Sequence, residues 1–276
     1  MSRRASKQRA ATLSALVCLL ALTAAAPAAP TAAHQPAKKP PGSLLDSVPK
    51  SGVLRVCTTG DYRPFTYKDQ KDGSYSGVDI DMAKDLAKSL DAKARFVDAT
   101  WANLVSDLSA GKCDVAVGGV SITLPRARQV HFSEPTREDG KTPVVRCADK
   151  DTYKTLDDID KPGTKVIVNP GGTNEQFARA HIQQATITVH PDNTTIFDEI
   201  VAGRADVMMT DASETLYQAK IHPELCSVHP DEPFTFSEKA YATPRGDRDF
   251  QEYVDQFVHL AKHDGTYATY EAEWMS

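Results

Sequence analysis

Two periodicities of apolar residues alternate along the chain after residue 51. Short apolar, β-branched runs predict buried strands, and runs with apolar residues three and four positions apart predict helices. The predicted strands are residues 54–58, 94–97, 115–117, 144–145, 164–168, 186–189 and 206–209. The predicted helices are residues 78–90, 101–109, 156–159, 175–181, 193–202, 213–220, 249–262 and 266–274. This order predicts an α/β fold with parallel sheets flanked by helices.

A glycine-rich turn joins the strand at 164–168 to the helix at 175–181. Gly171 and Gly172 permit a tight turn and a close approach of a ligand. Thr173 is placed to cap the helix with its hydroxyl, and the free backbone N–H groups there form an anion site. Glu175 follows in the first helical turn. A carboxylate beside an anion site indicates either an ammonium to be bound or a proton to be delivered; in the simpler interpretation it only favours the helix dipole.

Polar or glycine-rich sequences follow four of the predicted strands, at residues 60–62, 118–121, 171–173 and 210–211. In parallel α/β sheets, ligands bind at the carboxyl ends of the strands. These four segments are therefore expected to converge on one cleft.

The N-terminus has the pattern of a secretory signal peptide. Basic residues precede an apolar run at residues 13–22, and small residues with alanine-rich cleavage sequences follow. We predict a signal peptide over 1–33, a disordered leader over 34–50 rich in Pro and Lys, and a folded domain from about Ser51. The apolar run is too short to span a bilayer comfortably. The chain is therefore expected to be periplasmic or secreted, without stable membrane insertion.

Charge and cysteine usage narrow the classes of function. The net charge is −5 with both signs interspersed, and no basic patch indicates nucleic-acid binding.

Because exported proteins oxidise cysteine pairs, Cys147 and Cys226, each beside a strand-like run, are the expected disulfide. Cys57 and Cys113 are interpreted as small buried hydrophobes. No metal is expected, since residues 222–229 lack a second group of well-spaced ligands.

Seven motifs across the chain resemble the polar amino-acid solute-binding proteins, the two-lobed class that serves ABC transporters. They are GVLRV (52–56), PFTY (64–67), GVDID (77–81), GKCD (111–114), SITLPR (121–126), FSEP (132–135) and residues 206–211. The resemblance implies a type II periplasmic-binding-protein-like fold with a ligand cleft between two lobes. Lobe 1 would comprise 51–141 plus 240–276, and lobe 2 would comprise 142–239. It also implies that Arg126 clamps a ligand carboxylate with help from Ser121 and Thr173, and that Asp211 holds an α-ammonium group.

Within this class, further motifs resemble the cyclohexadienyl dehydratases, exported enzymes built on the same fold. These motifs lie at residues 58–65, 139–143, 169–180, 189–197, 208–212, 222–230 and 238–241. The resemblance implies a carbon–oxygen lyase that converts prephenate to phenylpyruvate and arogenate to phenylalanine without a cofactor. The match at Cys147 and Cys226 strengthens the expected disulfide, whereas Cys57 and Cys113 depart from the enzyme pattern.

The lyase chemistry assigns roles to the motif residues. Hydroxide leaves poorly, so a general acid must protonate the ring hydroxyl, and Glu175, with a pKa raised in a closed cleft, is the expected acid. Lys141 meets the second carboxylate or is a solvated hinge lysine. Trp101 is a cleft wall or a core residue, and Asn193 is an N-cap or a ligand contact. Asn174 is grouped with Thr173 among the substrate-binding residues.

A second class of function remains open from the sequence. A non-catalytic receptor for an amino acid or related carboxylate would use the same fold and dock to a membrane permease, because fold alone does not specify function. Glu175 in its matched context favours the enzyme. A small-molecule substrate is the expected partner in either case, and a homo-oligomer is left open.

Overall fold

The computed structural model describes residues 42–275. The predicted signal peptide, 1–33, and residues 34–41 of the predicted leader lie outside the described residues. Helix α1 (Leu44–Ser51) falls within the rest of that leader, so the expectation of disorder is wrong for this segment. Val48 of α1 is buried against the first core, and the side chain of Ser43 caps the helix. The helix is amphipathic, and its apolar face is what orders it.

The first five-stranded sheet has the order β5-β1-β6-β15-β7. β1 pairs in parallel with β5 and β6, but β15 is antiparallel to both of its neighbours. Its strands are β1 (Val53–Thr58), β5 (Lys93–Asp98), β6 (Val115–Ala116), β7 (Val130–Phe132) and β15 (Ala242–Pro244).

The second five-stranded sheet has the order β11-β10-β12-β9-β13. β10 is parallel to β11 and β12, whereas β9 is antiparallel to β12 and β13. Its strands are β9 (Lys141–Arg146), β10 (Lys165–Val168), β11 (Thr186–Val189), β12 (Val207–Asp211) and β13 (Leu225–Ser227). Both sheets are therefore mixed, and the prediction of parallel sheets is wrong for the strands that enter from the connections between the sheets.

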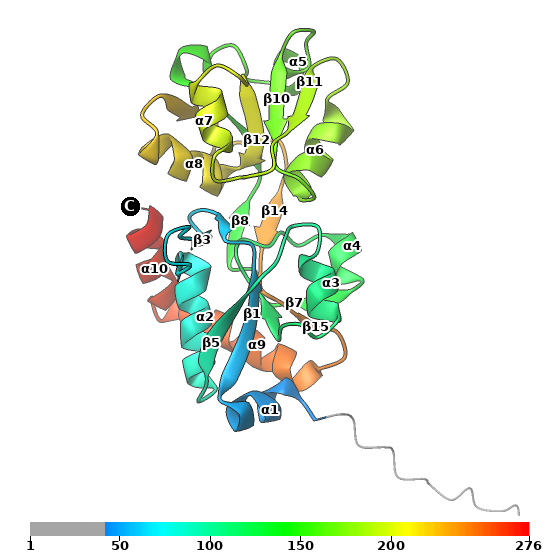
Figure 1. The fold of residues 1–276 in the computed structure, drawn as a ribbon, viewed down its shortest axis with the longest axis vertical. Helices are drawn as coiled ribbons and strands as arrows, with labels where there is room; N and C mark the ends of the chain where they lie inside the picture. Colours follow the sequence, from blue (N-terminus) through cyan, green and yellow to red (C-terminus); the bar gives the residue numbers. More distant parts are fainter. Residues whose placement is uncertain (1–41, 276) are drawn as a thin grey trace, which may run out of the picture. The chain divides into compact units, whose positions relative to one another are not determined.

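Two short antiparallel strands, β8 (Arg137–Asp139) and β14 (Ser237–Lys239), pair with each other (Figure 1). β8 leads into β9 of the second sheet, and β14 leads back into β15 of the first. A further small sheet contains β2 (Asp61–Tyr62), β3 (Thr66–Lys68) and β4 (Tyr75–Ser76). The chain passes between the two sheets at β8 and β14, close to the expected lobe boundaries. The exact residue numbers of those boundaries stay a prediction.

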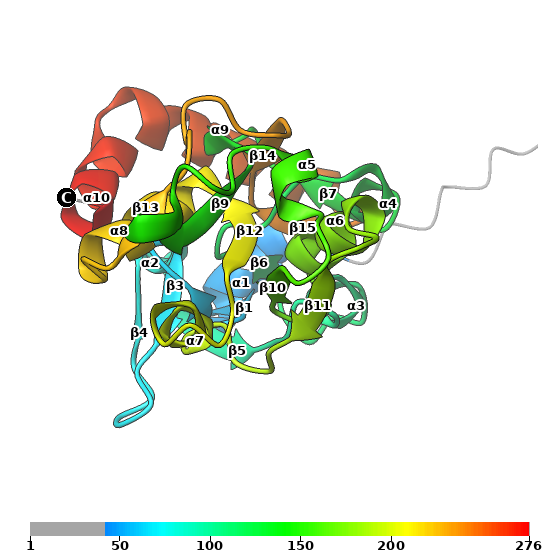
Figure 2. The same ribbon diagram turned by 90° about the horizontal axis from the view of Figure 1, so that it is seen from above.

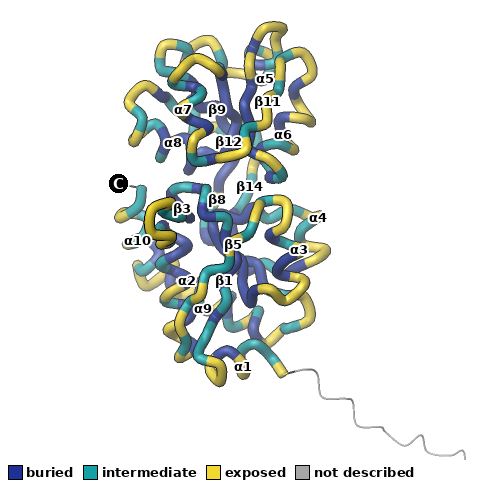
Figure 3. The backbone as a smooth tube through the Cα atoms, in the orientation of Figure 1, coloured by how far each residue is buried: buried dark blue, intermediate teal, exposed yellow. Residues whose placement is uncertain are grey.

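Helices cover the sheets and complete the cores. α6 (Thr173–His181) and α8 (Ala212–Ile221) lie on either side of β12 (Figures 1 and 2). β9 and β12 are buried along nearly their whole length (Figure 3). The remaining helices are α2 (Val78–Ser89), α3 (Leu104–Ser109), α4 (Leu124–Ala127), η1 (Cys147–Asp149), α5 (Leu156–Ile159), α7 (Ile196–Val201), α9 (Arg248–His263) and α10 (Thr266–Met275). Among the described residues, no helix combines the length and apolarity that a membrane crossing needs.

Two disulfides link the described cysteines. Cys147 and Cys226 are bonded, with Cα atoms 4.8 Å apart, as the sequence predicted. Cys57 and Cys113 are also bonded, with Cα atoms 5.6 Å apart, so their interpretation as free buried residues is wrong. β1 and β6 are neighbours in the first sheet, which brings residue 57 next to the segment that precedes β6.

Candidate active site

A small central cavity of about 10 Å³ lies where the strand-end segments meet. Such a volume holds about one water molecule, so this conformation must open to admit a substrate. Five of the expected site residues line the cavity: Trp101, Ser121, Thr173, Asn174 and Asp211. The other lining residues are Tyr62, Gly119, Asn169 and Gly172.

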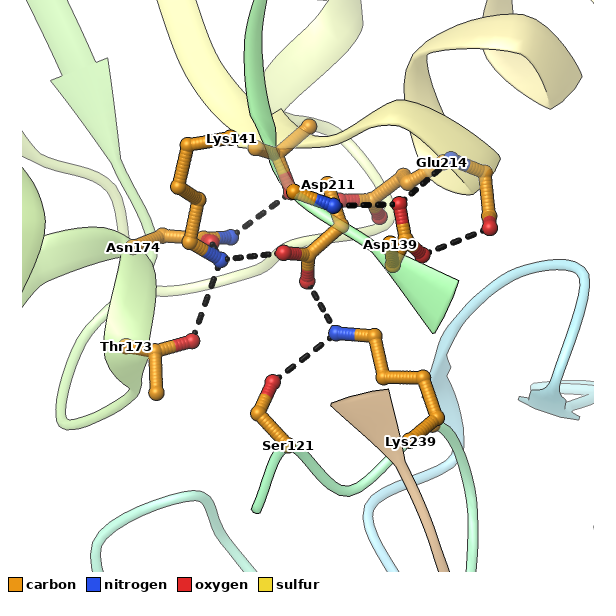
Figure 4. A network of polar contacts seen from close by, with 12 residues as sticks. Ser121, Asp139, Lys141, Thr173, Asn174, Asp211, Glu214 and Lys239 are labelled. Atoms are coloured by element: carbon orange, nitrogen blue, oxygen red, sulfur yellow. Dashed lines mark hydrogen bonds and ion pairs between the residues drawn. The ribbon is translucent and has the colours of Figure 1, made fainter. Parts of the chain in front are cut away.

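The carboxylate of Asp211, at the end of β12, is the centre of a buried ion cluster (Figure 4). It accepts a hydrogen bond from Lys141 Nζ at 2.8 Å, from Lys239 Nζ, and from the Tyr62 hydroxyl at 2.5 Å. Burial would raise the pKa of Asp211, but the two ammonium groups outweigh burial and hold it well below its usual range. Asp211 is thus an ionised carboxylate that is already paired with two lysines, and its expected contact with an α-ammonium group stays a prediction.

Lys141, at the start of β9, is buried, so its interpretation as a solvated hinge lysine is wrong. Its Nζ donates to Asp211, to Asn174 Oδ1 at 2.5 Å and to Thr173 Oγ1 at 3.1 Å. Burial lowers the pKa of Lys141, and Asp211 opposes that effect. Lys141 therefore ties the start of α6 to the end of β12.

The start of α6 is not capped by the Thr173 hydroxyl, as the sequence had predicted. The helix begins at Thr173 with Gly172 as its N-cap, and the Thr173 hydroxyl makes no capping bond. That hydroxyl instead accepts from Lys141 at the cavity wall. A Cβ at Gly171 would lie 2.9 Å from the Ala102 side chain, so the absent side chain lets the turn pack against the segment before α3.

The Glu175 carboxylate is bonded within its own turn and helix in the described conformation. Its carboxylate accepts from Gly171 N at 2.7 Å and from Arg179 Nε at 2.8 Å, and it does not line the cavity. These two donors lower the pKa of Glu175, where the acid role expected of it needs a raised pKa. The anion site of the glycine turn is thus occupied by the chain's own carboxylate.

Arg126 lies beside the cavity but does not line it. Its guanidinium donates to Ser121 O at 2.9 Å, and burial lowers its pKa while Asp211 opposes the change. The Ser121 hydroxyl accepts from Lys239 Nζ at 2.8 Å. A third cation is therefore linked to the lysine cluster through Ser121.

Lys239 and Tyr62 are site residues that the sequence did not single out. Lys239, at the end of β14, has a side chain only 1% exposed, and its bonds reach Ser121 and Asp211. Tyr62, in β2, packs edge-on against Trp101 with ring centroids 5.3 Å apart. The motif at 238–241 contained the signal for Lys239, but nothing in it indicated that the side chain points inward.

Glu214, on α8, is a third residue that the sequence did not single out, and it is a buried carboxyl group. It is fully buried, and it accepts from Thr210 Oγ1 at 2.6 Å and from Asn193 Nδ2 at 2.9 Å. Burial raises its pKa to about 8, aided by the negative charge of Asp211. Thr210 in turn accepts from Asn174 Nδ2 at 2.9 Å, which connects Glu214 to the cavity wall. Glu214 is thus a carboxylic acid that keeps its proton at neutral pH.

Asn193 is not the N-cap that was one of its two expected roles, whereas Trp101 lines the cavity, as one of its two expectations had it. α7 begins at Ile196, so Asn193 caps no helix; its Nδ2 instead bridges Glu214 and the backbone oxygen of Asp61. Trp101 is a cavity wall, and its indole N–H donates to Asp61 Oδ1 at 3.1 Å. Both side chains therefore donate a hydrogen bond to Asp61.

The chain is similar to known proteins over most of its length. The family described as "Bacterial extracellular solute-binding proteins, family 3" matches residues 54–276. Cyclohexadienyl dehydratase of Pseudomonas aeruginosa is 52% identical over 84% of this chain and 86% of that protein. An ancestral amino acid-binding protein, described as a precursor of cyclohexadienyl dehydratase, is 38% identical with a TM-score of 0.78 over 85% of this chain and 100% of its own. A single-residue variant of an ancestral cyclohexadienyl dehydratase is 52% identical with a TM-score of 0.54 over 85% of this chain and 97% of its own.

Proposed function

The chain belongs to family 3 of the bacterial extracellular solute-binding proteins, and on this fold we propose that it works as an exported cyclohexadienyl dehydratase. It would convert prephenate to phenylpyruvate and L-arogenate to L-phenylalanine. In each reaction the ring loses its hydroxyl as water and its carboxylate as CO₂, and it becomes aromatic. Aromatisation drives the step, so the proposal needs a proton donor and carboxylate-binding groups, and no cofactor.

The observation that carries the proposal is a neutral carboxylic acid behind the wall of a cationic cavity, where Glu214 is bonded to Thr210 and Thr210 to the wall residue Asn174. Glu214 has a pKa of about 8, so it is mostly protonated at neutral pH. A general acid with a pKa near the working pH is the kind that a poor leaving group such as hydroxide requires, and it contributes about 10²–10⁴-fold to the rate. We assign the proton transfer to Glu214, acting when the lobes close on the substrate.

The charges around the cavity suit a substrate with two carboxylates. Lys141, Lys239 and Arg126 supply three cations, and Asp211 is the carboxylate bonded to both lysines. Asp139 is held by Ser213 Oγ at 2.6 Å and by Gly140 N at 2.9 Å. The cluster therefore retains positive charge to be met by the carboxylates of prephenate.

The same cluster weakens the receptor alternative. A receptor for an amino acid needs a free anionic group for the α-ammonium, and the two lysines and Tyr62 already occupy Asp211. The same pairing favours prephenate, which has no ammonium group, over L-arogenate as the substrate. The aromatic walls provided by Tyr62 and Trp101 instead suit a flat six-membered ring.

Glu175 remains a second candidate for the acid. Entry of a substrate carboxylate at the glycine turn would compete for Gly171 N, and the added negative charge would raise the pKa of Glu175. This route needs the side chain to leave Arg179 and turn to the cavity. Glu214 does not line the cavity either, but it needs no change in its protonation state, and for that reason we favour it.

One experiment tests both the function and the acid. Phenylpyruvate formation from prephenate is measured for the purified protein and for its Glu214→Gln and Glu175→Gln variants at pH 7, above the spontaneous rate. We expect turnover by the wild type, a loss of about 10²-fold or more in Glu214→Gln, and a smaller loss in Glu175→Gln. The reverse order would give the acid role to Glu175, and no turnover by the wild type would refute the dehydratase.

A further inference from the structure

The motif at 77–81 contributes a buried carboxylate that the proposed chemistry does not use. Asp79 lies in the first turn of α2 and is only 1% exposed. A carboxylate at such a position commonly serves the start of its own helix. The Asp79 carboxylate instead accepts hydrogen bonds from two segments that lie far from it in the sequence. It is thus placed to hold those two segments together.

The first of these segments is the glycine turn that follows β6. Asp79 Oδ2 accepts from the backbone N–H of Gly118 at 2.9 Å and of Gly119 at 2.7 Å. Both glycines have positive φ angles, +114° and +70°, and successive N–H groups in such a turn converge on one anion. Gly119 lines the central cavity, and a Cβ there would lie 2.7 Å from the Tyr62 ring. Asp79 therefore fixes the backbone of this part of the cavity wall.

The second segment carries Lys239. The Tyr241 hydroxyl, which is fully buried, donates to Asp79 Oδ1 at 3.0 Å. A backbone hydrogen bond of 3.0 Å joins this segment to the one that follows Gly119. Lys239 Nζ donates across the same junction to Ser121 Oγ at 2.8 Å (Figure 4). Asp79 thus bonds to both of the strands of chain that bring Lys239 and Ser121 together.

Asp79 does not itself line the cavity, so its effect on a ligand passes through these neighbours. Lys239 is a buried cation of the site and pairs with Asp211, and Gly119 is part of the wall. Groups that bind a carboxylate must be held in fixed positions, since a displacement of about 1 Å can cost about 10²-fold in rate. Three hydrogen bonds from one buried side chain provide such a constraint.

We propose that Asp79 is a positioning residue for substrate binding, which holds Lys239 and the wall at Gly119 in place through its three hydrogen bonds. The inference rests on the proposed dehydratase function and is the same whichever carboxyl group is the general acid. Lys239 attracts a substrate carboxylate both before and during the reaction, so its displacement weakens binding of substrate and transition state alike. Loss of the Asp79 carboxylate should therefore raise KM and leave kcat nearly unchanged.

The test is to measure KM and kcat for prephenate, at pH 7 and above the spontaneous rate, in two variants of Asp79. Asp79→Ala removes all three hydrogen bonds. Asp79→Asn keeps one oxygen for the two glycines, and its amide N–H can donate to the hydroxyl oxygen of Tyr241. We expect KM to rise about tenfold in Asp79→Ala, the factor that one lost charge-assisted hydrogen bond implies. Asp79→Asn should keep KM close to that of the wild type.

Tyr241→Phe examines the path to Lys239 alone and keeps the proposal testable if Asp79→Ala does not fold. It removes the bond to Asp79 Oδ1 and leaves both glycine bonds in place. We expect a rise in KM of about threefold, because one bond of the three is lost.

Asp114→Ala and Tyr270→Phe are the matched controls, and neither residue lines the cavity. The buried Asp114 carboxylate, just before β6, accepts from Arg55 N at 2.8 Å, and the Tyr270 hydroxyl donates to Asp85 at 2.6 Å. Both controls should lower the midpoint of thermal unfolding while KM stays at the wild-type value.

An unchanged KM in both Asp79→Ala and Tyr241→Phe would overturn the proposal. A similar rise in KM in the two controls would overturn it as well, because the effect would then follow from lost stability. An Asp79→Asn variant as impaired as Asp79→Ala would show that the charge of Asp79, and not its hydrogen bonds, matters. Failure of the dehydratase function is seen separately, as the absence of turnover in the wild type.

Discussion

The buried Glu214 predicts a pH dependence of stability that a single substitution removes. Its pKa rises from an ordinary 4.5 to about 8 on folding. A carboxyl with a raised folded-state pKa contributes its full stability below pH 4.5 and loses it as the pH rises towards 8, because the unfolded chain ionises first. Each pH unit in this window costs about 1.4 kcal/mol. Near the folded pKa the loss levels off, so we expect about 2 kcal/mol between pH 6 and pH 8.

Urea unfolding of the wild type and Glu214→Gln at pH 6, 7 and 8 measures this difference. The glutamine keeps the volume and cannot ionise. From pH 6 to pH 8, the free energy of unfolding of the variant should therefore rise by about 2 kcal/mol relative to that of the wild type. Asp79, whose pKa is raised by burial to about 6, titrates in both proteins and cancels. Glu175→Gln is the matched control, because the pKa of Glu175 is lowered and its charge is constant in this range. Parallel pH dependence of the wild type and Glu214→Gln would refute the burial argument.

Three further predictions follow from other parts of the structure. Replacing Cys57 and Cys113 by Ser should lower the free energy of unfolding by about 4 kcal/mol, as chain entropy implies for a separation of 56 residues, with little change in the KM for prephenate. Gly119→Ala should raise that KM, because its Cβ would lie 2.7 Å from the Tyr62 ring and the backbone has φ +70°. Asp211→Asn leaves two lysines without their shared carboxylate and should lower the free energy of unfolding, measured by thermal denaturation, by about 3–5 kcal/mol. Because phenylpyruvate brings a carboxylate, it should stabilise this variant more than the wild type.

Local sequence patterns predicted most of the elements. The amphipathic run at 78–90 became α2, and the β-branched run at 164–168 became β10 almost to the residue. The strand-end segments do meet at one cavity, since Ser121, Thr173 and Asp211 all line it. Periodicity and strand-end rules work here because they depend on neighbours in sequence and on the direction of the strands.

The residues that the sequence missed depend on contacts between distant segments. Glu214 is a polar residue on a helix, and only the packing of α8 against Asn193 and Thr210 makes it a buried acid. The bond between Cys57 and Cys113 needs β1 and β6 to be neighbours, which no local pattern specifies. The disorder expected at 44–50 fails for the same reason, because α1 is ordered by packing on the first core.

The most direct test of the central claim is the pH profile of kcat/KM for prephenate, measured above the spontaneous rate. This quantity reports the essential acid of the free enzyme. Glu214 as the acid predicts activity that persists to about pH 8 and then falls about tenfold per pH unit. A decline that is already under way in acidic solution and continues through neutral pH would match an acid with a lowered pKa, such as Glu175, and would contradict the account.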